Sequence, residues 1–363
     1  MNADFILAIG ELGKEKGIDP ELLFQAVEEA LVTAYKKNFG SNQNVRVDMN
    51  KVTGELHIYA QRHIVAEVGD DPNEISLEEA RKIDPRDEVD DIVETEVTPR
   101  NFGRIAAQNA KQVVVQRIRE AERGMVFEKF SSRENDIVTG IIQRMENKNV
   151  YIDLGKAEAI LTPNEQIPGE IYQYHDRMKT YIVEVKKTSK GPQIMVSRTH
   201  PGLLKRLFEL EVPEIHDGLV EIKSVAREPG MRSKISVYTK DENIDPVGAC
   251  VGHKGMRVQT IVNELRGEKI DIVKYSSEPD QYVANALSPA KVVSTEVLEE
   301  EKICRVIVPD YQLSLAIGKE GQNARLAAKL TGWKIDIKSE SQAAEEAEQG
   351  AQEVGVAYEA DED

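Results

Sequence analysis

The pattern of apolar and polar positions divides the chain into regions of different period. Apolar residues recur every three or four positions over 23–34, after an Asp-Pro pair of the kind that starts helices. A period of two follows at 45–49 and 56–60, which predicts a hairpin with one buried face. A second helical stripe predicts a helix over 101–123. The first third of the chain is therefore expected to be a mixed α/β domain.

Residues 134–199 contain short runs rich in β-branched residues, separated by turn signals. Five such runs in about 65 residues match the strand count and size of an OB-type barrel. These barrels bind single-stranded nucleic acid with aromatic and basic side chains on one face. The alternative, that the tyrosines within 172–181 only seal the edge of the barrel, stays open. The candidates for an RNA-binding face are Tyr151, Tyr172, Tyr174, Arg177 and Lys179.

Residues 200–340 contain an internal repeat. Each copy has two strand candidates, a short apolar helix, a Gly-x-x-Gly loop, an amphipathic helix ended by glycine, and a strand beginning Lys-Ile-Asp-Ile. The glycines that open the two loops, Gly252 and Gly318, lie 66 positions apart. A repeated unit of this kind predicts two successive domains with the same fold. The expected fold of the two copies is a pair of tandem KH domains with the type II order α-β-β-α-α-β.

The Gly-x-x-Gly loop suits nucleic-acid binding because glycine lets a phosphate approach the backbone closely. The helix after the loop presents unpaired N–H groups and the positive end of its dipole. KH modules use such a loop to clamp about four nucleotides. One Gly-x-x-Gly occurs by chance in many chains, whereas two in the same frame are specific; the alternative is that these glycines are only caps. Glu320 is expected to weaken the second clamp electrostatically. The predicted RNA-binding residues are Gly252, His253, Lys254, Gly255 and Arg257 in the first copy, and Gly318, Lys319, Glu320, Gly321 and Arg325 in the second.

The net charge changes how this RNA binding is expected to work. The chain has 47 Lys and Arg against 64 Asp and Glu, a formal charge of −17. That balance excludes a protein that covers nucleic acid non-specifically with a basic surface. Residues 1–125 hold 24 acids and 16 bases, residues 340–363 hold nine acids and no base, and residues 126–339 hold 31 of each. The excess of acidic residues lies at the two ends of the chain. The middle is therefore expected to bind RNA through a few Lys and Arg side chains at specific positions.

Acidic and basic segments adjoin one another near the N-terminus. Residues 67–96 carry 13 acids and three bases, which describes either a solvated acidic face or a docking surface. Four bases gather on one arc of the helix predicted after them. A surface of this kind suits a protein partner at least as well as RNA. The four bases are Arg100, Arg104, Lys111 and Arg119.

Other chemistry is not indicated. Two cysteines, Cys250 and Cys304, are too few for a disulfide framework or a four-ligand zinc site, and both lie in apolar runs typical of buried positions. No nucleotide-binding, metalloprotease or hydrolase motif occurs, so we expect no catalysis, no cofactor and no metal. No apolar run reaches the roughly 18–20 residues of a membrane span. A cytoplasmic protein without a signal peptide is expected.

Four long stretches resemble the NusA family of bacterial transcription termination/antitermination proteins. They are NFGRIAAQNAKQVVVQRIREAER (101–123), VSRTHPGLLKRLFELEVPEI (196–215), DPVGACVGHKGMRVQTIVNELRGEKIDI (245–272) and LAIGKEGQNARLAAKLTGWKIDI (315–337). The resemblance implies a non-catalytic, monomeric factor that modulates pausing, intrinsic termination and antitermination together with other elongation factors. It implies that the N-terminal domain binds core RNA polymerase, for which the four bases are candidates, and that the S1-motif barrel and both KH domains bind nascent single-stranded RNA.

The resulting expectation is a multidomain α+β protein with an acidic tail. Two other functions stay open, namely a subunit of an RNA-processing enzyme and a protein that binds structured RNA on the ribosome. The expected segments are an N-terminal domain at 1–125, an S1-motif OB barrel at 134–199, KH domains at 202–276 and 279–340, and a disordered acidic tail at 341–363.

Overall fold

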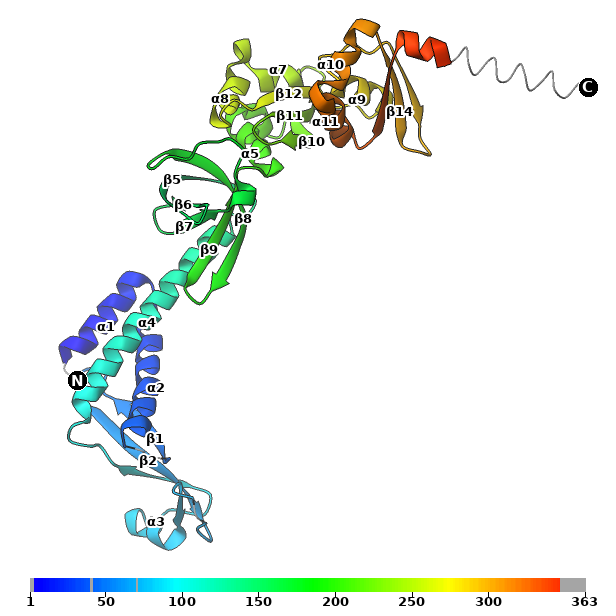
Figure 1. Ribbon diagram of the computed structural model, residues 1–363. Helices are drawn as coiled ribbons and strands as arrows, with labels where there is room; N and C mark the ends of the chain where they lie inside the picture. The colour runs from blue at the N-terminus through cyan, green and yellow to red at the C-terminus, as the bar shows by residue number, and fades with distance from the viewer. Residues whose placement is uncertain (1–2, 40–41, 70, 347–363) are drawn as a thin grey trace, which may run out of the picture. The chain divides into compact units, whose positions relative to one another are not determined.

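The computed structural model describes residues 3–39, 42–69 and 71–346 (Figure 1). The chain divides into two compact units, the first ending at Glu128 and the second beginning at Lys129. Both units mix helices and strands, which confirms the predicted fold class. None of the described helices is long and apolar enough to cross a membrane.

The first unit packs three helices on one face of a four-stranded sheet. Strands β1 and β2 form the predicted hairpin, and β2 also pairs with β3 in parallel and with β4 antiparallel. Leu31 of α2, Val47 of β1 and Phe102 of α4 belong to the shared core. The elements are α1 (Ala3–Lys16), α2 (Pro20–Phe39), β1 (Asn44–Met49), β2 (Leu56–Val65), β3 (Glu74–Ser76), α3 (Leu77–Ile83), β4 (Ile92–Glu96) and α4 (Phe102–Ser131).

Helix α4 is longer than the sequence pattern predicted. The expected end was residue 123, but the helix continues to Ser131. Gly124 lies inside this helix, at a position where an added Cβ would meet nothing within 4 Å. Phe130 is 2% exposed, so burial of an apolar side chain favours the additional turns.

The second unit begins with a closed five-stranded barrel. The strand order is β5-β6-β7-β9-β8, with β7 and β9 parallel and the other pairs antiparallel. Alternate side chains point inward, among them Ile152, Leu161 and Ile194, all fully buried. The predicted OB-type barrel is confirmed. Its strands are β5 (Ile137–Glu146), β6 (Asn149–Asp153), β7 (Glu158–Leu161), β8 (Arg177–Thr188) and β9 (Gly191–Ser197).

Two KH domains follow, which we call KH1 and KH2, and both have the predicted type II order. In each, the last strand pairs in parallel with the middle strand of a three-stranded sheet. The first loop (Gly252–Gly255) and the second loop (Gly318–Gly321) each join two helices. KH1 consists of α5 (Pro201–Glu211), the short α6 (Pro213–His216), β10 (Glu221–Glu228), β11 (Arg232–Tyr238), α7 (Pro246–Val251), α8 (Met256–Glu264) and β12 (Lys269–Lys274). KH2 consists of α9 (Pro279–Ala286), β13 (Ser294–Leu298), β14 (Ile303–Val308), α10 (Leu313–Ile317), α11 (Gln322–Thr331) and β15 (Lys334–Ser339).

KH2 packs against the sheet of KH1 (Figure 1). Ala226 and Val273 of the KH1 sheet share one core cluster with Tyr282 and Ala286 of α9. Helix α11 also contacts β10 and β11. Lys234 of β11 is fully buried, and its Nζ donates hydrogen bonds to the Asp271 carboxylate at 3.0 Å and to a carbonyl just after α9 at 2.9 Å. The two domains therefore form one continuous structure.

A second buried network connects the barrel to KH1. Arg198, 1% exposed, pairs with Glu170 of the barrel and donates to the Glu264 carbonyl of KH1 at 2.9 Å. Arg227 and Glu268 form a fully buried ion pair, and Arg227 also donates to the His200 carbonyl at 2.9 Å. These bonds satisfy charges that burial without a partner would make very costly.

The C-terminal tail begins differently from its prediction. Residues 340–346 are helical, so the expectation of disorder from 341 onward is wrong for its first six residues. Ser339 and Gln342 form a reciprocal capping box, with N–H to side-chain bonds of 3.1 and 3.3 Å. The Ser341 hydroxyl also donates to Asp310 at 2.6 Å. The rest of the predicted tail, 347–363, lies outside the described residues.

Candidate nucleic-acid interface

The two Gly-x-x-Gly loops have the same backbone conformation. Gly252 has φ 73° and ψ 176°, and Gly318 has φ 77° and ψ 172°. This combination is open only to glycine. Two residues later, Lys254 and Glu320 also have positive φ values, 49° and 54°. The repeat seen in the sequence is therefore a repeat of backbone shape.

Each loop folds tightly onto the first turn of the helix that follows it. A Cβ added to Gly252 would lie 2.7 Å from Cγ of Arg257. A Cβ added to Gly318 would lie 2.8 Å from both the backbone nitrogen and the Cβ of Asn323. The first glycine thus brings the loop backbone close to the start of α8 or α11, where the helix dipole favours an anion.

The middle residues of both loops face solvent. His253 and Lys254 of the first loop are exposed, and so are Lys319 and Glu320 of the second. The first loop therefore offers cationic and imidazole side chains beside a helix N-terminus, and the second offers one cation and one anion. Such an arrangement can hold a phosphate of a nucleic-acid backbone, and the first loop has the more favourable charge.

The predicted RNA ligand Arg257 also has a role inside KH1. Its Nη1 donates to the Ala249 carbonyl and to Oε2 of Glu214 at 2.9 Å. The carbonyl belongs to α7, the helix before the loop. Arg257 therefore ties together the two helices that the first loop joins.

The predicted RNA ligand Arg325 contacts both KH domains. Its Nε donates to Oε1 of Glu228, in β10, at 2.7 Å, and its Nη1 donates to the carbonyl of Glu320 at 3.1 Å. The hydrogen bond from Arg325 lowers the pKa of the Glu228 carboxyl, so this pair is ionised at neutral pH. Half of the Arg325 side chain remains exposed, at 47%.

Two of the predicted barrel residues are used in internal contacts. The Tyr172 hydroxyl donates to Glu170 at 2.8 Å and accepts the N–H of Ile167, and burial raises its pKa. The N–H and Nζ of Lys179 contact the Glu264 carboxylate of KH1 at 3.2 and 3.4 Å. The alternative of edge-sealing residues fits Tyr172. It also fits Tyr181, which is 6% exposed and stacks on the His200 ring with centroids 4.5 Å apart.

The other barrel candidates face solvent to different degrees. Tyr174 is 58% exposed, and Arg177 is exposed. Tyr151 is half-buried beneath Arg144, whose guanidinium carbon lies 3.8 Å from the ring centroid. Arg144 also pairs with Glu158 at 2.8 Å. Sequence reasoning missed this stack because the two residues meet only through strand pairing.

The four candidate bases of the first unit are all exposed. Within the part of the chain that the structure describes, none of the four forms an ion pair. Their charge is therefore available to a partner. The residues are Arg100, Arg104, Lys111 and Arg119.

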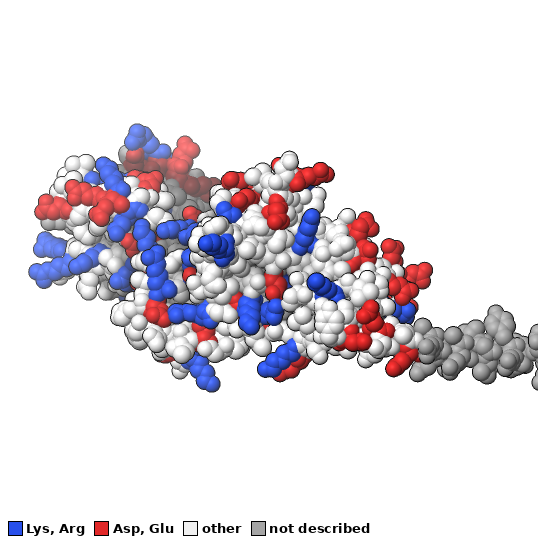
Figure 2. All heavy atoms as spheres, turned by 90° about the horizontal axis from the view of Figure 1, so that it is seen from above, with Lys and Arg blue, Asp and Glu red and all other residues white. Residues whose placement is uncertain are grey.

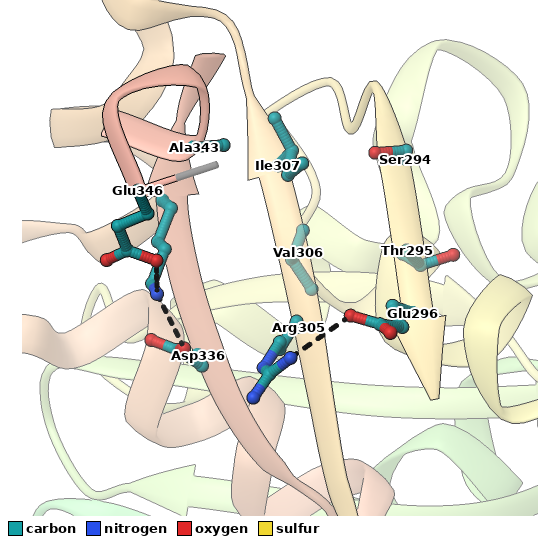
Figure 3. Close-up of a pocket in the computed structure, with 10 residues that line it drawn as sticks. Ser294, Thr295, Glu296, Arg305, Val306, Ile307, Asp336, Ala343 and Glu346 are labelled. Carbon is teal, nitrogen blue, oxygen red and sulfur yellow. Dashed lines mark hydrogen bonds and ion pairs between the residues drawn. The ribbon is translucent and has the colours of Figure 1, made fainter. Parts of the chain in front are cut away.

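Basic and acidic side chains are interspersed on the face shown in Figure 2, and they do not form one continuous basic surface. A groove of about 420 Å³ lies on the outer face of the KH2 sheet, beside residues 340–346 (Figure 3). Its cations are paired with acids, Arg305 with Glu296 at 3.4 Å and Lys338 with Asp336 at 3.6 Å. This groove therefore lacks the unpaired charge expected of a phosphate site.

Within the described ranges, no cluster of three or more His, Cys, Asp or Glu side chains is arranged so that it could hold a metal ion. Cys250 and Cys304 are free and buried, as their apolar surroundings in the sequence indicated. Burial raises the pKa of the Cys250 thiol to about 12, which makes it a poor nucleophile.

A closed S1-type barrel followed by two KH domains with matching loops defines a multidomain RNA-binding protein. Family models match the chain in the same order. They are the NusA N-terminal domain at 4–124, the S1 RNA binding domain at 131–197, the NusA-like first KH domain at 198–275 and the NusA-like second KH domain at 279–345. The chain belongs to the NusA family of transcription termination/antitermination proteins.

Three sequence relatives support this membership. Transcription termination/antitermination protein NusA of Halalkalibacterium halodurans is 65% identical over 95% of this chain and 90% of its own length. The protein of the same name from Bacillus subtilis is 64% identical over 95% of this chain and 93% of its own. The Thermus thermophilus protein is 42% identical over 92% and 89%. The solution structure of the N-terminal domain of NusA from B. subtilis is 54% identical, covering 34% of this chain and 99% of that domain, with a TM-score of 0.32.

Proposed function

We propose that this protein binds core RNA polymerase and nascent single-stranded RNA, and that it modulates pausing, intrinsic termination and antitermination. The observation that carries the RNA part is the pair of glycine loops, which share one backbone conformation at two helix N-termini, with a strained residue at positive φ (Lys254 or Glu320) in each. Strain of this kind persists where function requires it. The names of the relatives support the transcriptional part.

The proposal assigns separate tasks to separate segments. The domain at 1–125 contacts polymerase through exposed bases on and before α4, and the barrel at 134–199 assists RNA binding through Tyr151, Tyr174 and Arg177. The KH domains at 202–276 and 279–340 clamp the RNA backbone. Because the loops present glycine backbone and exposed charges to a phosphate, and no paired nucleophile and base, we assign no catalytic step to the protein. It acts in the cytoplasm as a monomer, together with other elongation factors.

The polymerase assignment can be tested with the full chain. Arg104→Glu/Lys111→Glu reverses two exposed charges on α4, and Arg81→Glu/Lys82→Glu makes the same net change on α3. The α4 variant should bind core RNA polymerase about tenfold more weakly, since a rim charge contributes to encounter and register. The α3 variant should bind nearly as well as the unmodified chain. The measurement is a titration followed by light scattering or interferometry.

Two outcomes would overturn this part of the proposal. One is equal binding of both variants and the unmodified chain, which would move the contact away from α4. The other is binding of the unmodified chain to ribosomes and not to polymerase, which would favour a role in translation.

A further inference from the structure

Glu228 of KH1 holds the start of a KH2 helix. Its Oε1 accepts from Nε of Arg325 at 2.7 Å, and its Oε2 accepts from Nε2 of Gln322 at 2.8 Å. Gln322 is the first residue of α11, and its preceding residue, Gly321, ends the second loop. The Glu228 side chain is only 17% exposed, so these bonds are partly protected from water. One carboxylate thus fixes two side chains in the first turn of α11.

Arg325 connects Glu228 to the backbone of the second loop. Its Nη1 donates to the carbonyl of Glu320, a middle residue of the second loop, at 3.1 Å. A guanidinium has five N–H donors in a planar fork. The contacts with Glu228 and Glu320 use two of them, and the side chain is 47% exposed. Arg325 is therefore an oriented cation beside the second loop, with donors that can serve a phosphate.

KH1 has no equivalent of these contacts between Glu228, Arg325 and Gln322. Sixty-six positions before Arg325 the sequence has Gln259, whose Nε2 donates to Asn263 within α8. The counterpart of Gln322 is Met256, which is 63% exposed. KH1 instead has Lys254 at the loop position that Glu320 occupies in KH2. The second loop has lost a cation at that position, and Arg325 lies next to it.

We propose that Arg325 supplies the phosphate-binding charge that Lys254 supplies in KH1, and that Glu228 of KH1 is the residue that positions it. The phosphate site of the second loop is then built from both KH domains. This inference rests on the proposed function of the loops as RNA clamps. Glu228 acts through Arg325 and does not itself touch RNA.

The direction in which one substitution changes RNA affinity distinguishes a positioning role of Glu228 from a simple effect of its charge. Glu228 is an acid near an RNA-binding loop, so charge alone predicts that its removal strengthens RNA binding. If Glu228 positions Arg325, its removal weakens binding, because the guanidinium must then be ordered when RNA binds. Glu228→Gln keeps an oxygen that accepts the Arg325 bond, and it should retain most of the affinity.

The experiment measures fluorescence anisotropy of a labelled single-stranded RNA with the full chain at several salt concentrations. The first loop carries His253→Asp/Lys254→Asp, so that the second loop dominates. Arg325→Ala should weaken binding about tenfold and reduce the slope of log K against log salt by about 0.7. Glu228→Ala should weaken it about fourfold, which is a smaller loss than that of the cation itself. Glu221→Ala is the matched control, because Glu221 lies on the same strand and, among the described residues, pairs only with exposed Lys223.

Exchanging the two charges tests whether the Glu228–Arg325 pair affects RNA affinity only by stabilising the fold. Glu228→Arg/Arg325→Glu can rebuild the ion pair and recover the melting temperature lost in Glu228→Ala, but it moves the cation away from the loop. RNA affinity should stay low in the swap. Recovery of both affinity and stability would show that the pair only holds the domains together, and would overturn the inference.

Lys319→Asp separates failure of the inference from failure of the proposed function. If Lys319→Asp weakens RNA binding and Glu228→Ala does not, the loop is a clamp and Glu228 does not position its charge. If neither substitution weakens binding, the second loop does not clamp RNA, and the inference falls together with that part of the proposed function.

Discussion

The first and second loops have one backbone shape, but different side chains hold it. The fifth residue after the opening glycine fixes the preceding helix in both domains. In KH1 this residue is Arg257, which donates to Ala249 and pairs with Glu214. In KH2 it is Asn323, whose Nδ2 donates to the Ala316 carbonyl at 3.0 Å. The comparison teaches that the repeat preserves the path of the backbone, while the bonds that stabilise it can change.

The two loops also differ in charge at a position where their backbones agree. Lys254 and Glu320 have φ values of 49° and 54°, and both side chains are exposed. Since neither side chain is needed for the shape of its loop, charge at this position can vary independently of fold. The next three predictions use this contrast between shape and charge.

The largest effect is expected from substitutions that disturb the backbone shape of the two loops. Gly318→Ala should lower the local unfolding free energy of α11 by about 3 kcal/mol, and Gly252→Ala that of α8 by about 2 kcal/mol. The difference arises because the new Cβ meets backbone in KH2 but the flexible Arg257 side chain in KH1. Native-state hydrogen exchange of the amides in each helix measures both values. Equal losses would show that backbone strain alone determines the cost.

A smaller effect is expected from charge in the unmodified background. His253→Asp/Lys254→Asp in the first loop should weaken single-stranded RNA binding about tenfold, and Lys319→Asp/Glu320→Asp in the second about threefold. The first change removes a lysine and adds two carboxylates, whereas the second removes a lysine and adds only one. Anisotropy titrations at two salt concentrations test this order. Unchanged affinity in both variants contradicts the assignment of either loop as a clamp.

The smallest effect is expected from exchanging the charges at the matched position. Lys254→Glu should weaken RNA binding about twofold to threefold, and Glu320→Lys should strengthen it by a similar factor. Both side chains are exposed, so thermal unfolding should stay the same. Combining the two substitutions should leave total affinity nearly unchanged. A large loss in the combined variant would mean that the two loops bind different parts of the RNA with unequal importance.

Much of the fold could be predicted because its signals are local in sequence. The β-branched runs of the barrel, the Gly-x-x-Gly loops and the Lys-Ile-Asp-Ile strands all lie within short segments, and the internal repeat indicated the order of the KH elements. The helical start of the tail was missed although its capping box, Ser339 to Gln342, is visible in the sequence. The extension of α4 beyond residue 123 was missed, because the burial of Phe130 that accompanies it arises only in the folded chain.

Less of the site could be predicted, because its side chains meet across domains. Lys179 looks like a nucleic-acid ligand in the sequence, but folding brings Glu264 of KH1 to it. Glu228 gave no sequence signal at all, since its partner Arg325 is 97 residues away. Type and spacing of residues indicate which groups can bind RNA, whereas tertiary contacts decide which of them remain available.

The buried charges between the domains determine where the chain can be divided for experiments. A fragment that ends after the barrel leaves Arg198 without its acceptor on KH1, and a fragment of KH1 alone opens fully buried Lys234 to water. The latter also uncovers Ala226 and Val273, an apolar sheet surface of the kind that promotes aggregation. The shortest fragment that keeps these side chains covered runs from the barrel through KH2. Binding studies on single domains would therefore report on surfaces that the intact protein never exposes.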